Sequence, residues 1–156
     1  MDARVRAVVE AGQALGIEVE PEEFPEGTRS AADAARAIGV PLGAIVKSLV
    51  FAVDGEPVVA LVSGANQLDE AKLARAAGGT SAWRHDADSV RDATGYGVGG
   101  VPPFGHRQAL PTFVDEDLMG YREVWAAAGT SRANFRLTPE ALVRATDGAV
   151  CDLARR

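Results

Sequence analysis

Two apolar runs joined by a two-residue turn signal constrain the fold of this chain most. Residues 44–53 and 57–62 are rich in β-branched and other apolar side chains, and Asp54-Gly55 stands between them. An Asp-Gly pair flanked by such runs is the strongest short-range signal for a hairpin, because both of its residues tolerate positive φ angles. The sequence therefore predicts an antiparallel hairpin formed by strands 44–53 and 57–62.

Caps, breakers and periodicity predict the other elements. Helices are expected at 3–15, from Ser30 to Gly39, at 69–77, at 86–95 and from Thr138 to about 148. Further strands are expected at 81–84, 108–114, 123–128, 133–137 and 149–153. Regular alternation of strand and helix is missing, which argues against a Rossmann-type sheet. We expect one α+β domain over residues 1–156, with a curved mixed sheet of about seven strands and helices packed outside.

Composition narrows the class of protein. The chain of 156 residues is 47% hydrophobic and 24% charged, as is usual for one folded domain. No apolar run approaches the roughly 20 residues of a membrane span, the N-terminus lacks the apolar core of a signal peptide, and Cys151 is the one cysteine. We therefore expect a cytoplasmic protein without a membrane partner. The net charge of −6 argues against a protein that coats DNA or other long nucleic acids.

Several common catalytic motifs are missing. The sequence contains no phosphate-binding loop of the Gly-x-x-x-x-Gly-Lys type and no His-Glu-x-x-His zinc helix. Its two histidines, His85 and His106, are too few for a histidine-rich metal site. Cys151 lies in the apolar run 149–151, which favours packing over a role as nucleophile. The sequence predicts no cofactor and no metal.

Lys47 stands inside the apolar strand 44–53. By strand alternation it shares a face with Ile45, Leu49 and Phe51. Ammonium groups are rarely buried without a partner or a purpose, so Lys47 is a candidate functional residue. Two structural alternatives remain open: the side chain extends outward from an edge strand, or this face of the strand is the wetter one.

Residues 96–105 form a loop that is rich in glycine and contains Pro102 and Pro103. It cannot be a regular helix, and its prolines interrupt any central strand. Glycine permits the close approach of a ligand to the backbone, whereas the alternative interpretation is an ordinary irregular connection.

Four segments, residues 27–35, 45–51, 94–105 and 128–138, together resemble the YbaK/prolyl-tRNA editing domain family. The resemblance covers residues 24–153 and depends on the ordered set of segments rather than on one motif. It implies a mixed α/β fold built around a barrel-like sheet. It also implies a trans-editing hydrolase that removes a wrongly attached amino acid, alanine or cysteine, from proline tRNA, with prolyl-tRNA synthetase as a possible partner.

The resemblance makes Lys47 the catalytic residue, which holds the 3′ phosphate or ribose of the CCA end or stabilises the developing oxyanion. The remaining predicted site residues bind substrate: Thr28, Ser48, Gly97, Gly99, Gly100, Val101, Pro102, Pro103, Phe104, Gly105, His106, Ser131 and Asn134. Backbone amides near Gly99 and Gly100 are expected to grip the carbonyl group, and Phe104 is the preferred side chain for stacking on the terminal base. Water is the expected nucleophile.

Some of these residues have alternative interpretations. Thr28 is also explained as a helix-entry residue, Ser131 and Asn134 as parts of a polar turn, and His106 as a surface histidine with its hydrogen bonds satisfied. Pro102 stands where family members often carry Ser or Thr, which leaves the amino acid specificity open. Two other functions also remain open: a non-catalytic module that binds a tRNA end or nucleotide beside a synthetase, and a deacylase of another small ester.

Overall fold

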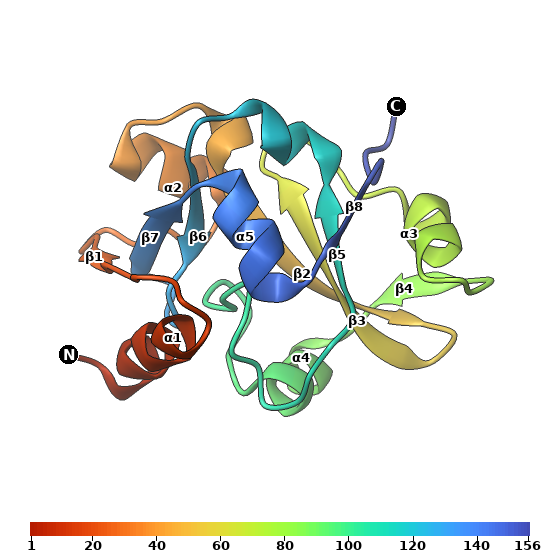
Figure 1. Cartoon of the computed structure of the whole chain (residues 1–156), viewed down its shortest axis with the longest axis horizontal. Helices are drawn as coiled ribbons and strands as arrows, with labels where there is room; N and C mark the ends of the chain where they lie inside the picture. The colour runs from red at the N-terminus through yellow and green to blue at the C-terminus, as the bar shows by residue number, and fades with distance from the viewer.

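A computed structural model describes residues 1–156 and contains five α-helices, two 3-10 helices and eight strands (Figure 1). In chain order they are α1 (Ala3–Ala14), β1 (Glu22–Glu23), α2 (Ala31–Ile38), η1 (Leu42–Ala44), β2 (Val46–Val53), β3 (Glu56–Ser63), α3 (Glu70–Ala76), β4 (Ala82–Arg84), α4 (Ala87–Thr94), β5 (Thr112–Asp115), η2 (Glu116–Gly120), β6 (Val124–Ala127), β7 (Ala133–Leu137), α5 (Pro139–Thr146) and β8 (Ala149–Cys151). The predicted α+β class is confirmed. The largest difference from the predicted ranges is β5, which begins at Thr112, directly after a proline.

The strands form two sheets. The larger sheet has the order β4-β2-β3-β5-β8, and the smaller has the order β1-β7-β6. Strands β2 and β3 pair antiparallel from Val46↔Ser63 to Val53↔Glu56, which confirms the predicted hairpin. Strands β3 and β5 pair in parallel, as do β5 and β8, so the larger sheet is mixed.

The prediction of one barrel-like sheet is wrong, because the two sheets stay open. Strand β4 covers the outer side of β2 only at Phe51 to Val53. At the other end of β2, an isolated parallel bridge between Ile45 and Trp125 links the strand to the smaller sheet. Residues 47–50 therefore have no paired strand on their outer side, and this gap interrupts the ring that a barrel needs.

Alternation along β2 and β3 gives the larger sheet an apolar core on each face. On one face, Val46, Val50 and Leu61 belong to a core that also contains residues of α1, α5 and the smaller sheet. On the other face, Phe51 and Val62 pack with residues of α3 and the C-terminal segment. Period-two alternation in a strand buried on both faces explains this division.

Side-chain caps set where the helices begin. The hydroxyl of Ser30 accepts from the amide of Asp33 at 3.0 Å, so α2 begins at Ala31, and Thr28 and Arg29 lie just before the cap. Asp86 caps α4 and Thr138 caps α5 in the same way. These caps confirm three predicted helix starts, and each satisfies an amide that the first helical turn leaves unpaired.

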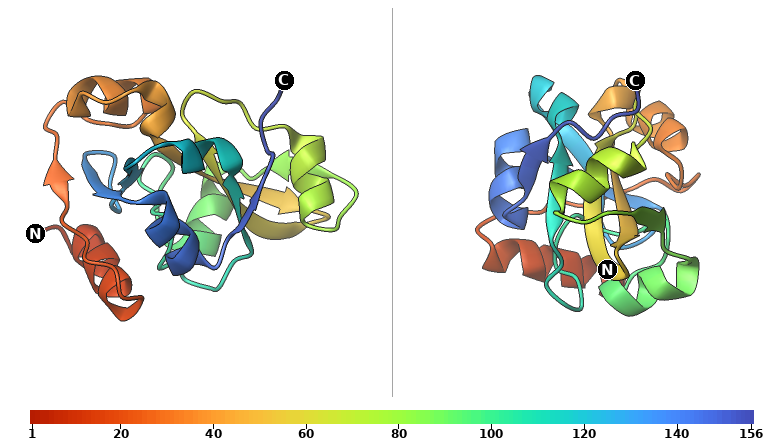
Figure 2. Two further views of the ribbon diagram at one scale, coloured as in Figure 1. Left: turned by 45° about the horizontal axis from the view of Figure 1, so that its top comes forward. Right: turned by 90° about the vertical axis from the view of Figure 1, so that its right-hand side faces the viewer.

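The molecule is longer in one direction than in the others (Figure 2). Helix α1, helix α2 and the smaller sheet lie at one end, and the tip of the β2–β3 hairpin lies with α3 and β4 at the other end (Figures 1 and 2). The gap beside β2 falls between these two ends. No helix combines the length and the apolar character that crossing a bilayer requires.

Candidate active site

A cavity of about 310 Å³ lies along the open edge of β2. This is within the volume range of small-molecule sites. Its wall contains the consecutive residues 45–50, together with residues before and within α2, at the end of β4, in α4 and in the glycine-rich loop. Consecutive residues of a strand point to opposite faces, so the cavity runs beside the strand edge rather than over one face.

The backbone of β2 offers hydrogen-bonding groups to this cavity. The amide of Gly64 donates to the carbonyl of Ile45 at 2.7 Å, so Ile45 and every second residue after it bond toward β3. Val46, Ser48 and Val50 therefore direct their N–H and C=O groups outward. The carbonyl of Val50 accepts from the amide of His85 at 3.2 Å, and the parallel bridge to Trp125 occupies the start of the strand, which leaves the groups of Ser48 facing the cavity.

Lys47 lies on the wall of the cavity and is half-buried. Its ammonium donates to the carbonyl of Asn66. Burial lowers the pKa of Lys47 below its usual value, the nearby Arg84 guanidinium lowers it further, and the Asp115 carboxylate opposes the change. The group therefore pays a desolvation cost that a freely exposed lysine avoids.

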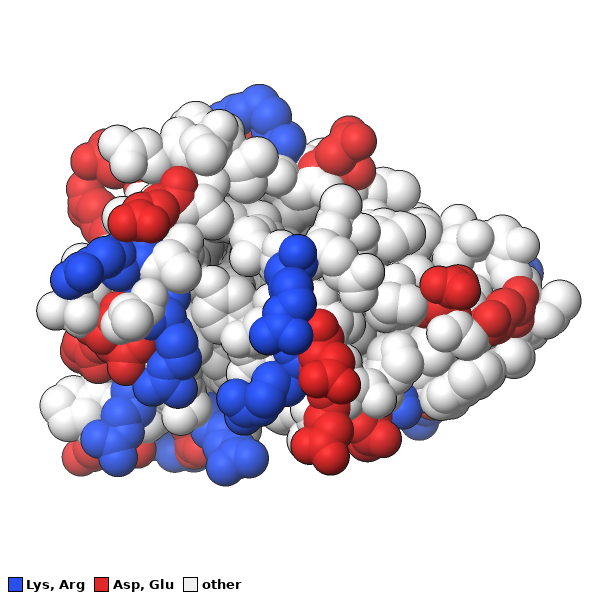
Figure 3. Space-filling model, turned by 90° about the horizontal axis from the view of Figure 1, so that it is seen from below, with Lys and Arg blue, Asp and Glu red and all other residues white.

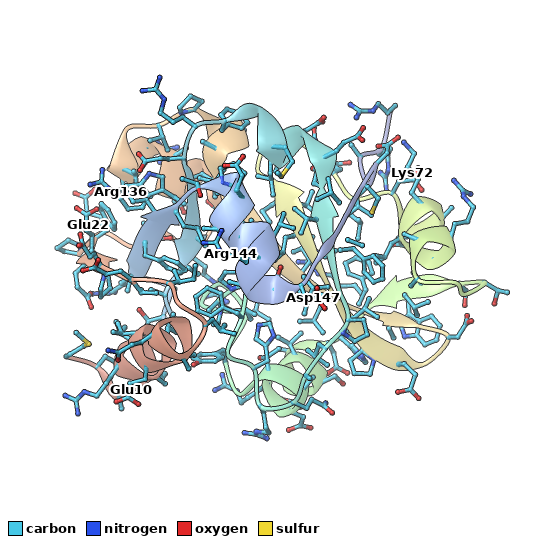
Figure 4. All side chains as sticks on the ribbon, in the orientation of Figure 1. Glu10, Glu22, Lys72, Arg136, Arg144 and Asp147 are labelled. Carbon is cyan, nitrogen blue, oxygen red and sulfur yellow. The ribbon has the colours of Figure 1, made fainter.

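The second lysine of the chain, Lys72, shows the contrast. Lys72 lies on α3 beside the C-terminal segment, where its ammonium binds the Asp152 carboxylate at 2.8 Å (Figure 4). No carboxylate forms such a pair with Lys47. The charge of Lys72 is thus neutralised locally, whereas the charge of Lys47 remains available to a ligand.

The cavity is positive although the chain is acidic. Arg29, Lys47 and Arg84 line it, and none of its lining residues is Asp or Glu. The net charge of −6 therefore arises elsewhere. On the face seen from below, basic and acidic side chains are interspersed among large uncharged areas, so this face carries no continuous acidic patch (Figure 3). A cavity lined by charge of one sign raises the local concentration of ions of the opposite sign.

Thr28 and Asn134, two of the residues predicted to bind substrate, lie in the cavity wall. The hydroxyl of Thr28 is buried, accepts from the Asn134 side-chain amide and donates to the Ser131 carbonyl at 3.2 Å. Thr28 therefore joins the loop before α2 to the turn before β7 and does more than begin a helix. Ser131 contributes this backbone carbonyl and does not itself line the cavity.

Of the residues in the glycine-rich loop that were predicted to bind substrate, two line the cavity: Gly99 and Val101. Gly99 has φ of +90°, and a Cβ there would lie 2.9 Å from Cγ of Arg29, so only glycine fits the turn beneath that arginine. The amide of Gly100 donates to the Gly97 carbonyl at 3.0 Å and is already used. The amides of Val98, Gly99 and Val101, which all lie in the cavity wall, donate to no protein acceptor.

The other predicted loop residues lie outside the cavity wall: Gly97, Gly100, Pro102, Pro103, Phe104, Gly105 and His106. The stacking role of Phe104 is wrong, because its ring is 4% exposed and packs edge-on against Phe135 at 5.8 Å between centroids. His106 Nε2 lies 2.7 Å from the Pro102 carbonyl, and since a carbonyl only accepts, the ring donates. Burial lowers the pKa of His106, so a neutral ring holds the loop together.

Sequence reasoning missed Arg29, Arg84 and His85 as parts of the site. Arg29 lies inside a segment that carries the family resemblance, and Arg84-His85 ends a short strand beside the strand of Lys47. If the pairing of the strand at 81–84 with the strand of Lys47 had been predicted, Arg84 and His85 would have been assigned to the site. Nε2 of His85 and the hydroxyl of Ser48 are buried without a hydrogen-bond partner.

The cysteine and the acidic residues of the chain offer no second catalytic centre. Cys151 packs at the edge of the core beside α3, and burial raises the pKa of its thiol, so it is not a thiolate nucleophile. No group of three or more His, Cys, Asp and Glu side chains is close enough to hold a metal ion. Trp125 lies in the core, with Phe24 edge-on at 6.5 Å between ring centroids.

Comparison with known proteins agrees with this geometry. Residues 25–145 match the aminoacyl-tRNA editing domain family. A protein of Enterococcus faecalis named "Putative Cys-tRNA(Pro)/Cys-tRNA(Cys) deacylase EbsC" is 31% identical over 134 residues, which cover 85% of this chain and 82% of that protein. A proline–tRNA ligase of Nitratidesulfovibrio vulgaris is 36% identical over 107 residues, which make up 69% of this chain and 18% of the ligase.

Solved structures give the same result. A structure described as "a putative trans-editing enzyme for prolyl tRNA synthetase" superposes with a TM-score of 0.94 at 44% identity, covering 100% of this chain and 99% of that one. The hypothetical protein APE2540 superposes with a TM-score of 0.88 at 29% identity, covering 96% of this chain and 99% of that one. The chain belongs to the aminoacyl-tRNA editing domain family.

Proposed function

We propose that this protein is a trans-editing hydrolase, which deacylates mischarged aminoacyl-tRNA and holds the charged CCA end in the cavity beside β2. The observation that carries the proposal is the charge of the cavity, where Arg29, Lys47 and Arg84 stand without a carboxylate in a chain of net charge −6. A tRNA end brings phosphates to such a site. A local basic cavity also explains how an acidic protein binds a short single strand without a basic surface.

Ester hydrolysis needs a water molecule, donors for the developing oxyanion and a departing ribose oxygen. Water attacks the ester carbonyl carbon, the bond to the ribose oxygen breaks, and the products are a free amino acid and a tRNA with its hydroxyl restored. The Lys47 ammonium is the charged group on the cavity wall that stabilises the oxyanion, and the amide of Ser48 on the open strand edge is a second donor.

Water rather than a side chain is the nucleophile in this proposal. The Ser48 hydroxyl makes no hydrogen bond to His85 or to any other base, so nothing withdraws its proton. The Cys151 thiol packs beside α3, outside the cavity wall. An aminoacyl ester is already reactive, so positioning and electrostatic stabilisation suffice.

Proline tRNA is the first substrate to test, because proline–tRNA ligases are among the relatives and one structural neighbour is described as editing for prolyl-tRNA synthetase. The experiment measures release of labelled amino acid from Ala-, Cys- and Ser-charged proline tRNA. Hydrolysis of at least one of them supports the proposal. Binding without release across the panel supports the non-catalytic module, and equal turnover of free aminoacyl esters supports a general esterase. Aminoacyl-tRNA is the substrate of cytoplasmic translation, so we place the protein in the cytoplasm.

Replacement of Arg84 by alanine is expected to weaken tRNA binding and to reduce its salt dependence. Each phosphate contact contributes a slope of about 0.7 in log affinity against log salt for a single strand. We expect KM for charged tRNA to rise and the slope to fall by about that amount, while kcat changes little. The measurement is KM for charged tRNA at several salt concentrations.

Arg136→Ala is the matched control for that variant. Arg136 is exposed on β7, at the rim of the molecule and outside the cavity wall (Figure 4). Its removal changes the net charge by the same unit. An equal fall of the salt slope in both variants would mean that overall charge, not the cavity, attracts the tRNA.

A further inference from the structure

The ammonium of Lys47 is positioned by a set of polar residues that do not line the cavity. Its ammonium donates to the backbone carbonyl of Asn66, which lies in the turn after β3. A backbone carbonyl fixes the position of an ammonium without removing its charge. The location of the Lys47 charge therefore depends on what holds Asn66.

Two carboxylates hold Asn66. Its side-chain amide donates to Asp115 at 2.9 Å and to Asp117 at 2.8 Å, and its backbone amide donates to the Ser63 carbonyl at 2.9 Å. Both donors of the side chain are thus used by acceptors of full charge. Charge-assisted hydrogen bonds of this kind are the strong ones, so the turn has one defined conformation.

Asp115 is the fixed point of this set. Its side chain is fully buried at the end of β5, where it also accepts from the amides of Ser63 and Asp117, each at 3.0 Å. A buried carboxylate persists only where donors compensate its lost hydration. We call Asn66, Asp115 and Asp117 the Asp115 brace.

We propose that Asn66 and Asp115 are positioning residues for the reaction, and that the Asp115 brace fixes both the place and the charge of the Lys47 ammonium. This inference depends on the catalytic role proposed for Lys47. The brace lies behind the strand and lines no part of the cavity, so its members act through Lys47 and not on the substrate.

The charges around Lys47 determine the direction of the effect. Arg84 at the end of β4 and Arg29 before α2 are the cations that share its cavity, Asp115 faces it from β5, and Asp117 stands in η2 behind Asn66. Burial and Arg84 lower the pKa of Lys47, and Asp115 opposes them. Removal of the Asp115 charge therefore lowers that pKa further and discharges Lys47 at a lower pH.

Direct titration of the two lysines tests the brace without any tRNA. With only Lys47 and Lys72 in the chain, a sample labelled at the lysine side chains gives two lysine signals in a heteronuclear NMR spectrum, and Lys72→Arg assigns them. In Asp115→Asn, we expect the Lys47 signal to titrate at lower pH than in the wild type.

Deacylation kinetics supply the second measurement. We expect Asn66→Ala to lower kcat by roughly 10–100-fold with a smaller change in KM, because the ammonium loses its place. We expect the alkaline limb of the pH–rate profile to move to lower pH in Asp115→Asn, in step with the NMR titration. A variant that only loosens the fold would lower the melting temperature without moving either the limb or the signal.

The outcomes separate the two proposals. A Lys47 signal that titrates at the wild-type pH in Asp115→Asn, or wild-type kcat in Asn66→Ala, overturns the brace. If no aminoacyl-tRNA is hydrolysed but the Lys47 signal moves as described, the brace stands and the proposed function fails. If Asp115→Asn does not fold, the Lys47 titration in Asn66→Ala decides. Without the Asn66 side chain the turn is no longer held, its backbone carbonyl moves away from the Lys47 ammonium, and the Lys47 signal must shift.

Discussion

Replacement of Lys47 by alanine is expected to lower deacylation by about 10²–10³-fold, the usual loss when one stabilising donor for an oxyanion is removed. Lys47 is the lysine on the cavity wall, and no carboxylate neutralises it. The substitution removes the lysine charge from the cavity wall and leaves the hydrophobic strand intact. The measurement is single-turnover release of amino acid from charged tRNA, with circular dichroism to verify the fold.

Lys72→Ala is the matched control for this prediction. It removes the same kind of residue and the same unit of charge, but at a surface site where the ammonium already binds Asp152 at 2.8 Å. The Lys72 side chain is 22% exposed and also donates to the Ala154 carbonyl at 2.7 Å, so we expect wild-type activity with a small fall in the melting temperature. Full activity in Lys47→Ala, or equal losses in both variants, would remove Lys47 from the mechanism.

The stability of a Lys47 variant should move in the opposite direction to its activity. Because the folded protein lowers the pKa of Lys47, the unfolded chain holds this proton more tightly. The charged form therefore costs stability at neutral pH, and the cost disappears as pH rises through the folded and then the unfolded pKa. We expect Lys47→Met, which keeps the stem without the charge, to unfold at or above the wild-type temperature at pH 7.

The hairpin and the helix caps were predictable from the sequence because they are local. Asp54-Gly55 needs only its own two residues and the apolar runs beside them, and Ser30 caps a helix with an amide three residues away. Such interactions depend on neighbours in the chain, so pattern and propensity suffice. Their agreement with the structure is what a locally consistent sequence should give.

The openness of the sheets was not predictable, because it depends on distant pairings. Whether residues 47–50 gain a partner strand on their outer side is decided by where β4 ends and by the link between Ile45 and Trp125. The same gap makes the cavity. Arg84 and His85 enter the site through this long-range pairing, so no local signal marked them.

Phe104 shows the opposite error. Its position inside a glycine-rich loop made it a candidate for stacking, yet the loop turns its ring into the core against Phe135. Residues 100–104 are all buried and Val101 is the one among them that lines the cavity, whereas Gly99 before them is partly exposed on the cavity wall. Composition could not separate the residues that support the loop from those that line the cavity, since glycine and proline serve both purposes.

Replacement of Gly100 by alanine is expected to have the second largest effect, through packing alone. A Cβ on Gly100 would lie 2.9 Å from Cα of Thr130 and 3.0 Å from the carbonyl oxygen of Gly129. Both are backbone atoms in the turn before β7, so no side chain can rotate away. Overpacking of this kind costs about 1–3 kcal/mol, which for a chain of this size lowers the melting temperature by roughly 2–12 °C.

The same substitution should lower activity because the glycine-rich loop and the turn before β7 form one wall of the cavity. Gly99 and Val101 flank Gly100, and Asn134 follows the turn against which the new methyl group would press. A displacement of about 1 Å between this wall and Lys47 can cost roughly 10²-fold in rate. We expect kcat to fall by that order in a protein that still folds below its lowered melting temperature.

Gly120→Ala is the matched control for Gly100→Ala. Gly120 has no atom within 4 Å of its added Cβ and no positive φ, so its methyl group enters open space. We expect its melting temperature and its kcat to match those of the wild type, since a surface change of this kind usually shifts stability by less than about 0.5 kcal/mol. Wild-type stability in Gly100→Ala would mean that the loop and the turn are not in contact, and the cavity would then lack the rigid wall on which the proposed chemistry depends.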